Sequence, residues 1–129
     1  MAVTDDLPEK NSSILNSIKV QLGIPESHTE FDQMIQLDIN TAFDILNQIG
    51  VGPKRPFVVE SDLDEWDQFI CQVNTEMVKR YVAMKVREMF DPPSGAAADA
   101  LTRQLDEITW RLSVAVHEAE REDDDDDEG

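Results

Sequence analysis

The sequence of 129 residues contains a single cysteine, few aromatic residues and no long apolar run. Cys71 has no second thiol in the chain with which to form a disulfide. The apolar stretches are short, such as Phe57–Val59, and fall far below the roughly 20 residues that a membrane-spanning helix requires. No basic start followed by an apolar core marks a secretory signal. We therefore expect a protein of a reducing compartment, with no membrane partner.

Basic residues are scarce as well. The formal net charge is −17, from 28 acidic and 11 basic residues, and the last nine residues include seven of the acids. The rest of the chain still carries a net charge near −11. Because affinity for DNA depends on Lys and Arg that release counterions from phosphates, this charge disfavours ordinary DNA binding.

The residue types that support catalysis are scattered along the chain. His28 and His117 lie in different predicted helix regions, and Cys71 lies beside an apolar helix face with no nearby histidine to activate it. The segment Gly50–Lys54 lacks the glycine that precedes the lysine of a phosphate-binding loop. The acidic segment Glu60–Asp67 lacks the ligand spacing and central glycine of a calcium loop. We predict no enzymatic activity, no cofactor and no metal site.

Hydrophobic periodicity predicts an all-α protein, a small bundle of about four helices. We expect the first helix to begin after Ser12 or Ser13 and to end at Gly23. The second is expected to follow a capping box formed by Ser27 and Glu30. Its apolar stripe consists of Phe31, Ile35, Ile39, Ala42, Phe43, Leu46 and Ile49.

Glycines and prolines in residues 50–56 predict a loop, and Phe57–Val59 suits a short extended segment between the second and third helices. Two pairs of residues could cap a further helix, Asp62 with Glu65 and Ser61 with Asp64. The apolar residues expected in that helix are Trp66, Phe69, Ile70 and Val73. Asn74 and Thr75 are expected to interrupt it before the next helical pattern begins.

From Glu76 to Phe90 the apolar residues form two adjacent stripes, which predicts a central helix with neighbours on two sides. The prolines of Asp91–Pro93 end this helix. The last helix is expected from about Ala96 to Arg121, with a stripe of the coiled-coil type. Trp110 lies about 180° from that stripe, where it either packs on another helix or contacts another subunit.

These patterns divide the chain into a flexible N-terminal arm, residues 1–11, a helical domain, residues 12–121, and an acidic C-terminal tail, residues 122–129. The tail contains Asp123, Asp124, Asp125, Asp126 and Asp127. It either keeps the protein soluble or docks on a basic partner. Four bases of the central helix are Lys79, Arg80, Lys85 and Arg87. They either balance nearby acids or contact an acidic patch on a neighbouring copy.

Two segments carry a likeness to a known family, Tyr81–Pro93 with the sequence YVAMKVREMFDPP and Leu105–Leu112 with the sequence LDEITWRL. They resemble the head-tail connector, or adaptor, proteins of long-tailed bacteriophages. The likeness covers about residues 12–115 and leaves out the arm and the tail. Met84 and Glu88 depart from the family pattern, in which a larger side chain and an apolar side chain are common at these positions.

The resemblance implies a structural virion protein of the neck between head and tail, assembled in the host cytoplasm. It implies a ring of twelve copies that binds the portal protein and further neck or tail proteins. DNA would pass through its channel without specific binding, and no catalysis is implied. The tail of Asp123 to Asp127 would face the portal or the channel. We expect subunit or partner contacts at Lys79, Arg80, Lys85, Arg87, Trp110 and Arg111.

The strong negative charge also supports another class of protein, a small acidic regulator that binds a basic host factor. Such a regulator would act as a monomer or dimer, whereas a connector would form rings when the portal is present.

Overall fold

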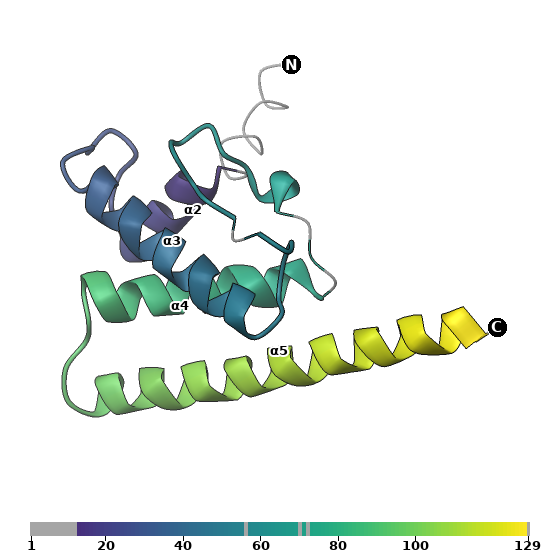
Figure 1. Cartoon of the computed structure of the whole chain (residues 1–129). Coiled ribbons are helices and arrows are strands. Elements are labelled where there is room, and N and C mark those ends of the chain that lie inside the picture. The colour runs from purple at the N-terminus through teal and green to yellow at the C-terminus, as the bar shows by residue number, and fades with distance from the viewer. Residues whose placement is uncertain (1–12, 56, 70, 72, 129) are drawn as a thin grey trace, which may run out of the picture.

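Four amphipathic segments of the sequence form the four α-helices in the described part of the chain (Figure 1). The computed structural model describes residues 13–55, 57–69, 71 and 73–128, the last seven by their backbone alone. The elements are α2 (Ile14–Leu22), α3 (Asp32–Gln48), the 3-10 helix η2 (Trp66–Gln68), α4 (Thr75–Phe90) and α5 (Ala96–Glu128). This described part contains no strand, so the predicted all-α class is confirmed.

Helix α2 has the bounds that its capping residues predict. Ser13 is the N-cap, and its side chain accepts a hydrogen bond from the backbone N–H of Asn16 at 3.3 Å. Its hydroxyl also donates to the carbonyl of Asp62 at 2.7 Å, which ties the start of α2 to a distant loop. Gly23 ends the helix in the left-handed conformation, with φ of 79°, which a side chain would disfavour.

Helix α3 begins later than the sequence predicts, at Asp32. The capping box of Ser27 and Glu30 is wrong, because Phe31 occupies the N-cap position with no side-chain hydrogen bond. Turns after Pro25 take up this stretch: the N–H of His28 donates to the Pro25 carbonyl at 3.0 Å. Phe31 is 45% exposed and does not join the core. The remaining apolar stripe is confirmed, with Ile35, Ile39, Ala42, Phe43 and Leu46 buried and Ile49 half-buried.

The segment between α3 and α4 crosses α3 as an irregular chain. Asn40 holds Val59 as a neighbouring strand would: its side-chain oxygen accepts from the Val59 N–H at 2.7 Å, and its amide donates to the Val59 carbonyl at 3.0 Å. The predicted extended segment is therefore present, without forming a described strand.

The helix predicted around Trp66 and Phe69 is reduced to the single turn η2. Ser61 and Asp64 do pair, since the Ser61 N–H donates to Asp64 Oδ2 at 3.2 Å, but this pair closes a turn and caps no helix. The capping box of η2 joins Glu65 to Gln68. The physical reason is an aromatic cluster on α3. The ring centroids of Trp66 and Phe69 lie 5.9 Å and 4.8 Å from that of Phe43. Phe69 packs on Phe43 from an extended backbone, with ψ of 94°, so the chain leaves the helical conformation directly after η2.

Helix α4 contacts α2, α3 and α5, which confirms the predicted central helix. Asn74 caps it, and its side-chain oxygen accepts from the backbone N–H of Glu76 at 2.8 Å. The interruption predicted at Asn74 and Thr75 is thus the start of α4. The buried residues of α4 are Val78, Tyr81, Val82 and Val86.

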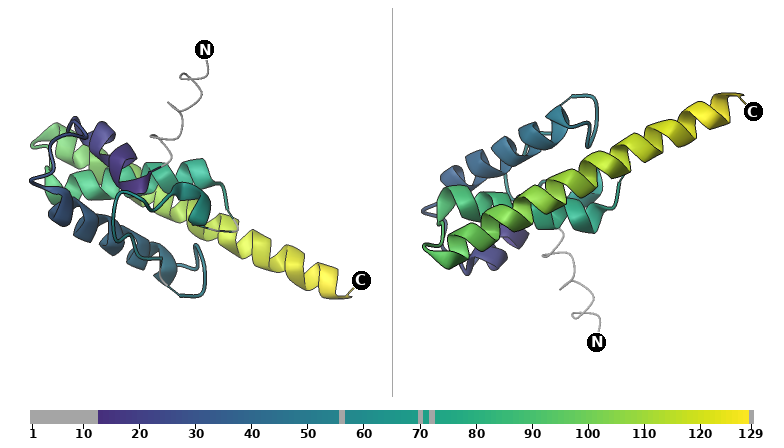
Figure 2. Two further views of the ribbon diagram at one scale, coloured as in Figure 1. Left: turned by 90° about the horizontal axis from the view of Figure 1, so that it is seen from above. Right: turned by 90° about the horizontal axis from the view of Figure 1, so that it is seen from below.

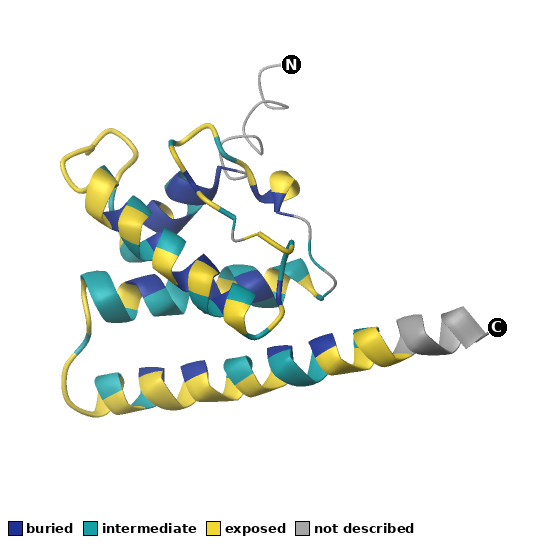
Figure 3. Cartoon of the chain, viewed as in Figure 1, coloured by how far each residue is buried: buried dark blue, intermediate teal, exposed yellow. Residues whose placement is uncertain are grey.

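Helix α5 packs along α4 with one face, as the dark blue residues of Figure 3 show. Leu101, Leu105, Leu112 and Val116 are buried there. The helix continues to Glu128, beyond the expected end at Arg121, since no glycine or proline interrupts it. Its C-terminal end extends past the other helices in both views of Figure 2.

Lys19 is fully buried, which periodicity alone does not predict because lysine is almost never buried unless it is paired. Its Nζ lies 2.8 Å from Asp32 Oδ1 and donates to the Glu26 carbonyl at 3.0 Å. These contacts join the end of α2, the following turns and the first residue of α3. The pair therefore sets how the two helices meet.

We expect Lys19→Met to lower the free energy of unfolding by about 2 kcal/mol, because it leaves the buried Oδ1 of a half-buried carboxylate without its partner. Asp32 Oδ1 has no hydrogen-bond partner that could replace the lysine. Urea denaturation measures the change. The double variant Lys19→Met/Asp32→Asn should recover part of the loss, and an unchanged stability of the single variant would contradict this role.

Burial, with a smaller contribution from the nearby Glu88 carboxylate, raises the pKa of Tyr81 from 10.0 to about 12. The unfolded chain therefore loses this proton at lower pH than the folded protein does. Stability from this group is complete below pH 10 and is lost as the pH rises from 10 to about 12, by no more than about 3 kcal/mol because solvent screens part of the effect. Tyr81→Phe should show a smaller loss of stability over this window in urea titrations. Parallel curves of stability against pH for the wild-type and Tyr81→Phe proteins would refute this role of Tyr81.

Candidate assembly surfaces

The residue types that support catalysis are not brought together by the fold. His28 and His117 are exposed on separate segments, and the Cys71 thiol donates to the Val73 carbonyl at 3.3 Å. Within the described ranges, no group of His, Cys, Asp or Glu is arranged to hold a metal ion. None of the helices in this part of the chain combines the length and apolarity needed to cross a membrane.

Three of the predicted interface residues are paired within the chain. Lys79 lies 3.2 Å from Glu76 and sits over the Trp66 ring, 5.7 Å from its centroid. Lys85 lies 2.8 Å from Glu88. On α5, Arg111 lies 2.9 Å from the carboxylate of Glu107. Lys79, Lys85 and Arg111 therefore balance acids of their own subunit.

Arg80 and Arg87 differ from the paired bases. Both are exposed, and neither side chain makes an ion pair or hydrogen bond with another described residue. Their positions, two helical turns apart, put them on the same face of α4, about 10 Å apart along its axis. The predicted set of four bases is thus not one stripe, and we call the part formed by Arg80 and Arg87 the arginine face.

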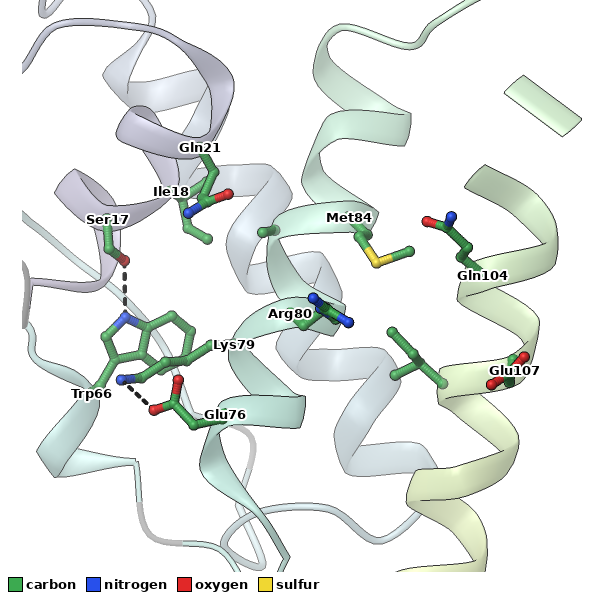
Figure 4. Close-up of a pocket in the computed structure, with 12 residues that line it drawn as sticks. Ser17, Ile18, Gln21, Trp66, Glu76, Lys79, Arg80, Met84, Gln104 and Glu107 are labelled. Atoms are coloured by element: carbon green, nitrogen blue, oxygen red, sulfur yellow. Dashed lines mark hydrogen bonds and ion pairs between the residues drawn. The ribbon is translucent and has the colours of Figure 1, made fainter. Parts of the chain in front are cut away.

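A hollow of about 710 Å³ lies beside Arg80, between α2, η2, α4 and α5 (Figure 4). Trp66 forms one wall and is held by a hydrogen bond from its ring N–H to the Ser17 hydroxyl at 2.9 Å. Met84 and Ile108 supply apolar lining from α4 and α5. Arg80 lies in the middle of this view, so the hollow combines an apolar surface with a free positive charge.

Trp110 lies on the face of α5 turned away from the bundle and is 66% exposed. The buried residues Leu105 and Leu112 lie on the opposite side of the same helix. Its predicted position is confirmed. In the isolated subunit it packs on no other helix of the core.

The outer face of α3 is an apolar surface that the sequence analysis missed. Phe31, Met34 and Leu37 are 45%, 58% and 67% exposed. Phe31 also packs edge-on against Phe90, with ring centroids 5.6 Å apart. The signal was present in the sequence, since Met34 and Leu37 are apolar residues outside the buried stripe of this helix. We call these three residues the α3 surface.

The predicted N-terminal arm and the side chains of Asp123 to Asp127 lie outside the described residues. The helical backbone of α5 does include the acidic run, because it reaches Glu128.

Comparison with known proteins places the chain in a family. No curated protein and no solved structure gives a significant match. The family model described as "Phage connector protein" matches residues 14–119. This range includes α2, α3, η2, α4 and most of α5, and confirms the resemblance found in the sequence. The chain therefore belongs to the phage connector protein family.

Proposed function

We propose that the chain is a structural subunit of the neck of a long-tailed phage. Twelve copies form a ring between the portal and the tail and surround the channel for DNA. The observation that carries this proposal is that two helices, α3 and α5, expose large apolar side chains on faces turned away from the core. Membership of the connector family supports the same reading.

A closed ring requires two different surfaces on each subunit, because every copy contacts the next in a head-to-tail manner. The α3 surface and Trp110 meet this requirement. They lie on separate helices that both pack on α4. Exposed aromatic and methionine side chains are also the types enriched at protein interfaces.

The charge of the subunit fits a channel through which DNA moves. A net charge of −17 offers phosphates few cations, so DNA would slide through without specific binding. In this proposal the ring binds the portal protein on one side and further neck or tail proteins on the other. The role is architectural and involves no catalysis.

The same negative charge favours a second candidate, an acidic regulator that binds a basic host factor. The two functions differ in assembly. The regulator remains a monomer or dimer in the presence of portal protein, and the connector forms a ring.

Native mass spectrometry of the purified chain, with and without the portal protein of the same phage, tests the proposal. We expect a complex of twelve copies on the portal. A chain that remains a monomer or dimer beside the portal would overturn the ring and favour the regulator.

We expect Trp110→Ala to weaken ring formation about tenfold or more, because a buried aromatic anchor contributes 2 kcal/mol or more at many interfaces. The stability of the isolated subunit should change by less than about 0.5 kcal/mol, since Trp110 is exposed. The matched control is Leu63→Ala, at a side chain that is 80% exposed on a loop. Native mass spectrometry over a concentration series measures how strongly each of the two variants assembles into rings. Equal effects of the two substitutions would remove Trp110 from the interface.

A further inference from the structure

We infer that the acidic C-terminal end of α5 in one copy docks on the arginine face of α4 in the next copy. The occupant of this face is thus a second copy of the same chain. The inference rests on the proposed function, because it specifies a contact between successive subunits of the ring.

Helix α5 extends well beyond the bundle. Val116 is the last buried residue described in this helix, and the helix continues to Glu128. At 1.5 Å per residue, this end extends about 18 Å past Val116. Figures 1 and 2 show it projecting beyond the other helices. It is long enough to reach across part of a neighbouring subunit.

The projecting end of α5 is strongly acidic. Glu118 and Glu120 are exposed on the projecting end, and seven of the last nine residues of the chain are acidic. Acids near the C-terminus of a helix oppose its dipole, and like charges four residues apart repel each other. A cationic neighbour would relieve both effects.

The arginine face is exposed and can receive an acidic partner. Lys79, Lys85 and Arg111 are already paired within the subunit, whereas Arg80 and Arg87 have no acidic partner among the described residues. Arginine forms two-pronged hydrogen bonds with carboxylates, which suits it to such a contact. The hollow beside Arg80 also offers Met84 and Ile108 as apolar surface on which a helix can rest.

The acidic end cannot reach the arginine face of its own subunit. Helix α5 is uninterrupted from Ala96 to Glu128, and its C-terminal end points away from the bundle (Figure 1). Bending it back would break the helix. The contact must therefore be made between copies. Because it joins two different surfaces, it propagates head to tail, and it gives a ring where the rotation from copy to copy closes, as in the proposed function.

A charge-exchange experiment tests this contact. One variant reverses the arginine face, Arg80→Glu/Arg87→Glu, and the other replaces every acid of the projecting end from Glu118 to Asp127 with lysine, which makes this end basic. Each alone places like charges in the contact, so we expect each to lose at least tenfold in ring formation on the portal. Mixed in equal amounts, the two variants should form rings again, because alternating copies restore opposite charges at every contact and a ring of twelve can alternate.

The matched control is Lys54→Glu/Arg55→Glu, which reverses two exposed bases on the loop after α3 and should leave the rings intact. Circular dichroism checks that every variant is folded. The inference is overturned if the Arg80→Glu/Arg87→Glu variant forms rings alone, or if the mixture of variants forms none. In both cases, rings of the wild-type chain would still support the proposed function. Absence of rings from the wild-type chain would instead overturn the proposed function, and the inference with it.

Discussion

Helix α4 is packed against three other helices at once, and the rest of the fold is arranged around this burial. Val78, Val82 and Val86 have no exposed surface, and each such side chain contributes about 2 kcal/mol when it is removed from water. Because α2, α3 and α5 all depend on α4 for their apolar contacts, their positions are set together. This leaves the opposite faces of α3 and α5 free to contact other molecules.

The distribution of positive charge follows a second constraint. The chain has 11 basic residues against 28 acids, and the structure uses several of these bases internally. Lys19 is buried against Asp32, and Lys79 and Lys85 pair with acids on their own helix. Few cations remain to receive a partner. Copies of so acidic a protein repel one another unless contacts are placed where these few cations lie, and Arg80 and Arg87 provide such a place.

Helix α5 links stability with assembly. One side of it completes the core through Leu101, Leu105 and Leu112, and the other side presents Trp110 to the solvent. Beyond Val116, none of the described side chains of this helix is buried. A helix with these features is expected in a protein whose role is to join neighbours, which agrees with membership of the phage connector family.

Local signals in the sequence determined the all-α class, the bounds of α2, the end of α4 before Pro92 and Pro93, and the outward position of Trp110. Caps, prolines and periodicity act within one or two helical turns, so they can be read without knowing the fold. Only the tertiary structure decided that Trp66 and Phe69 leave the predicted helix to pack on Phe43, that Lys19 is buried, and which bases remain unpaired. These outcomes depend on residues distant in the sequence that meet only after the helices have packed.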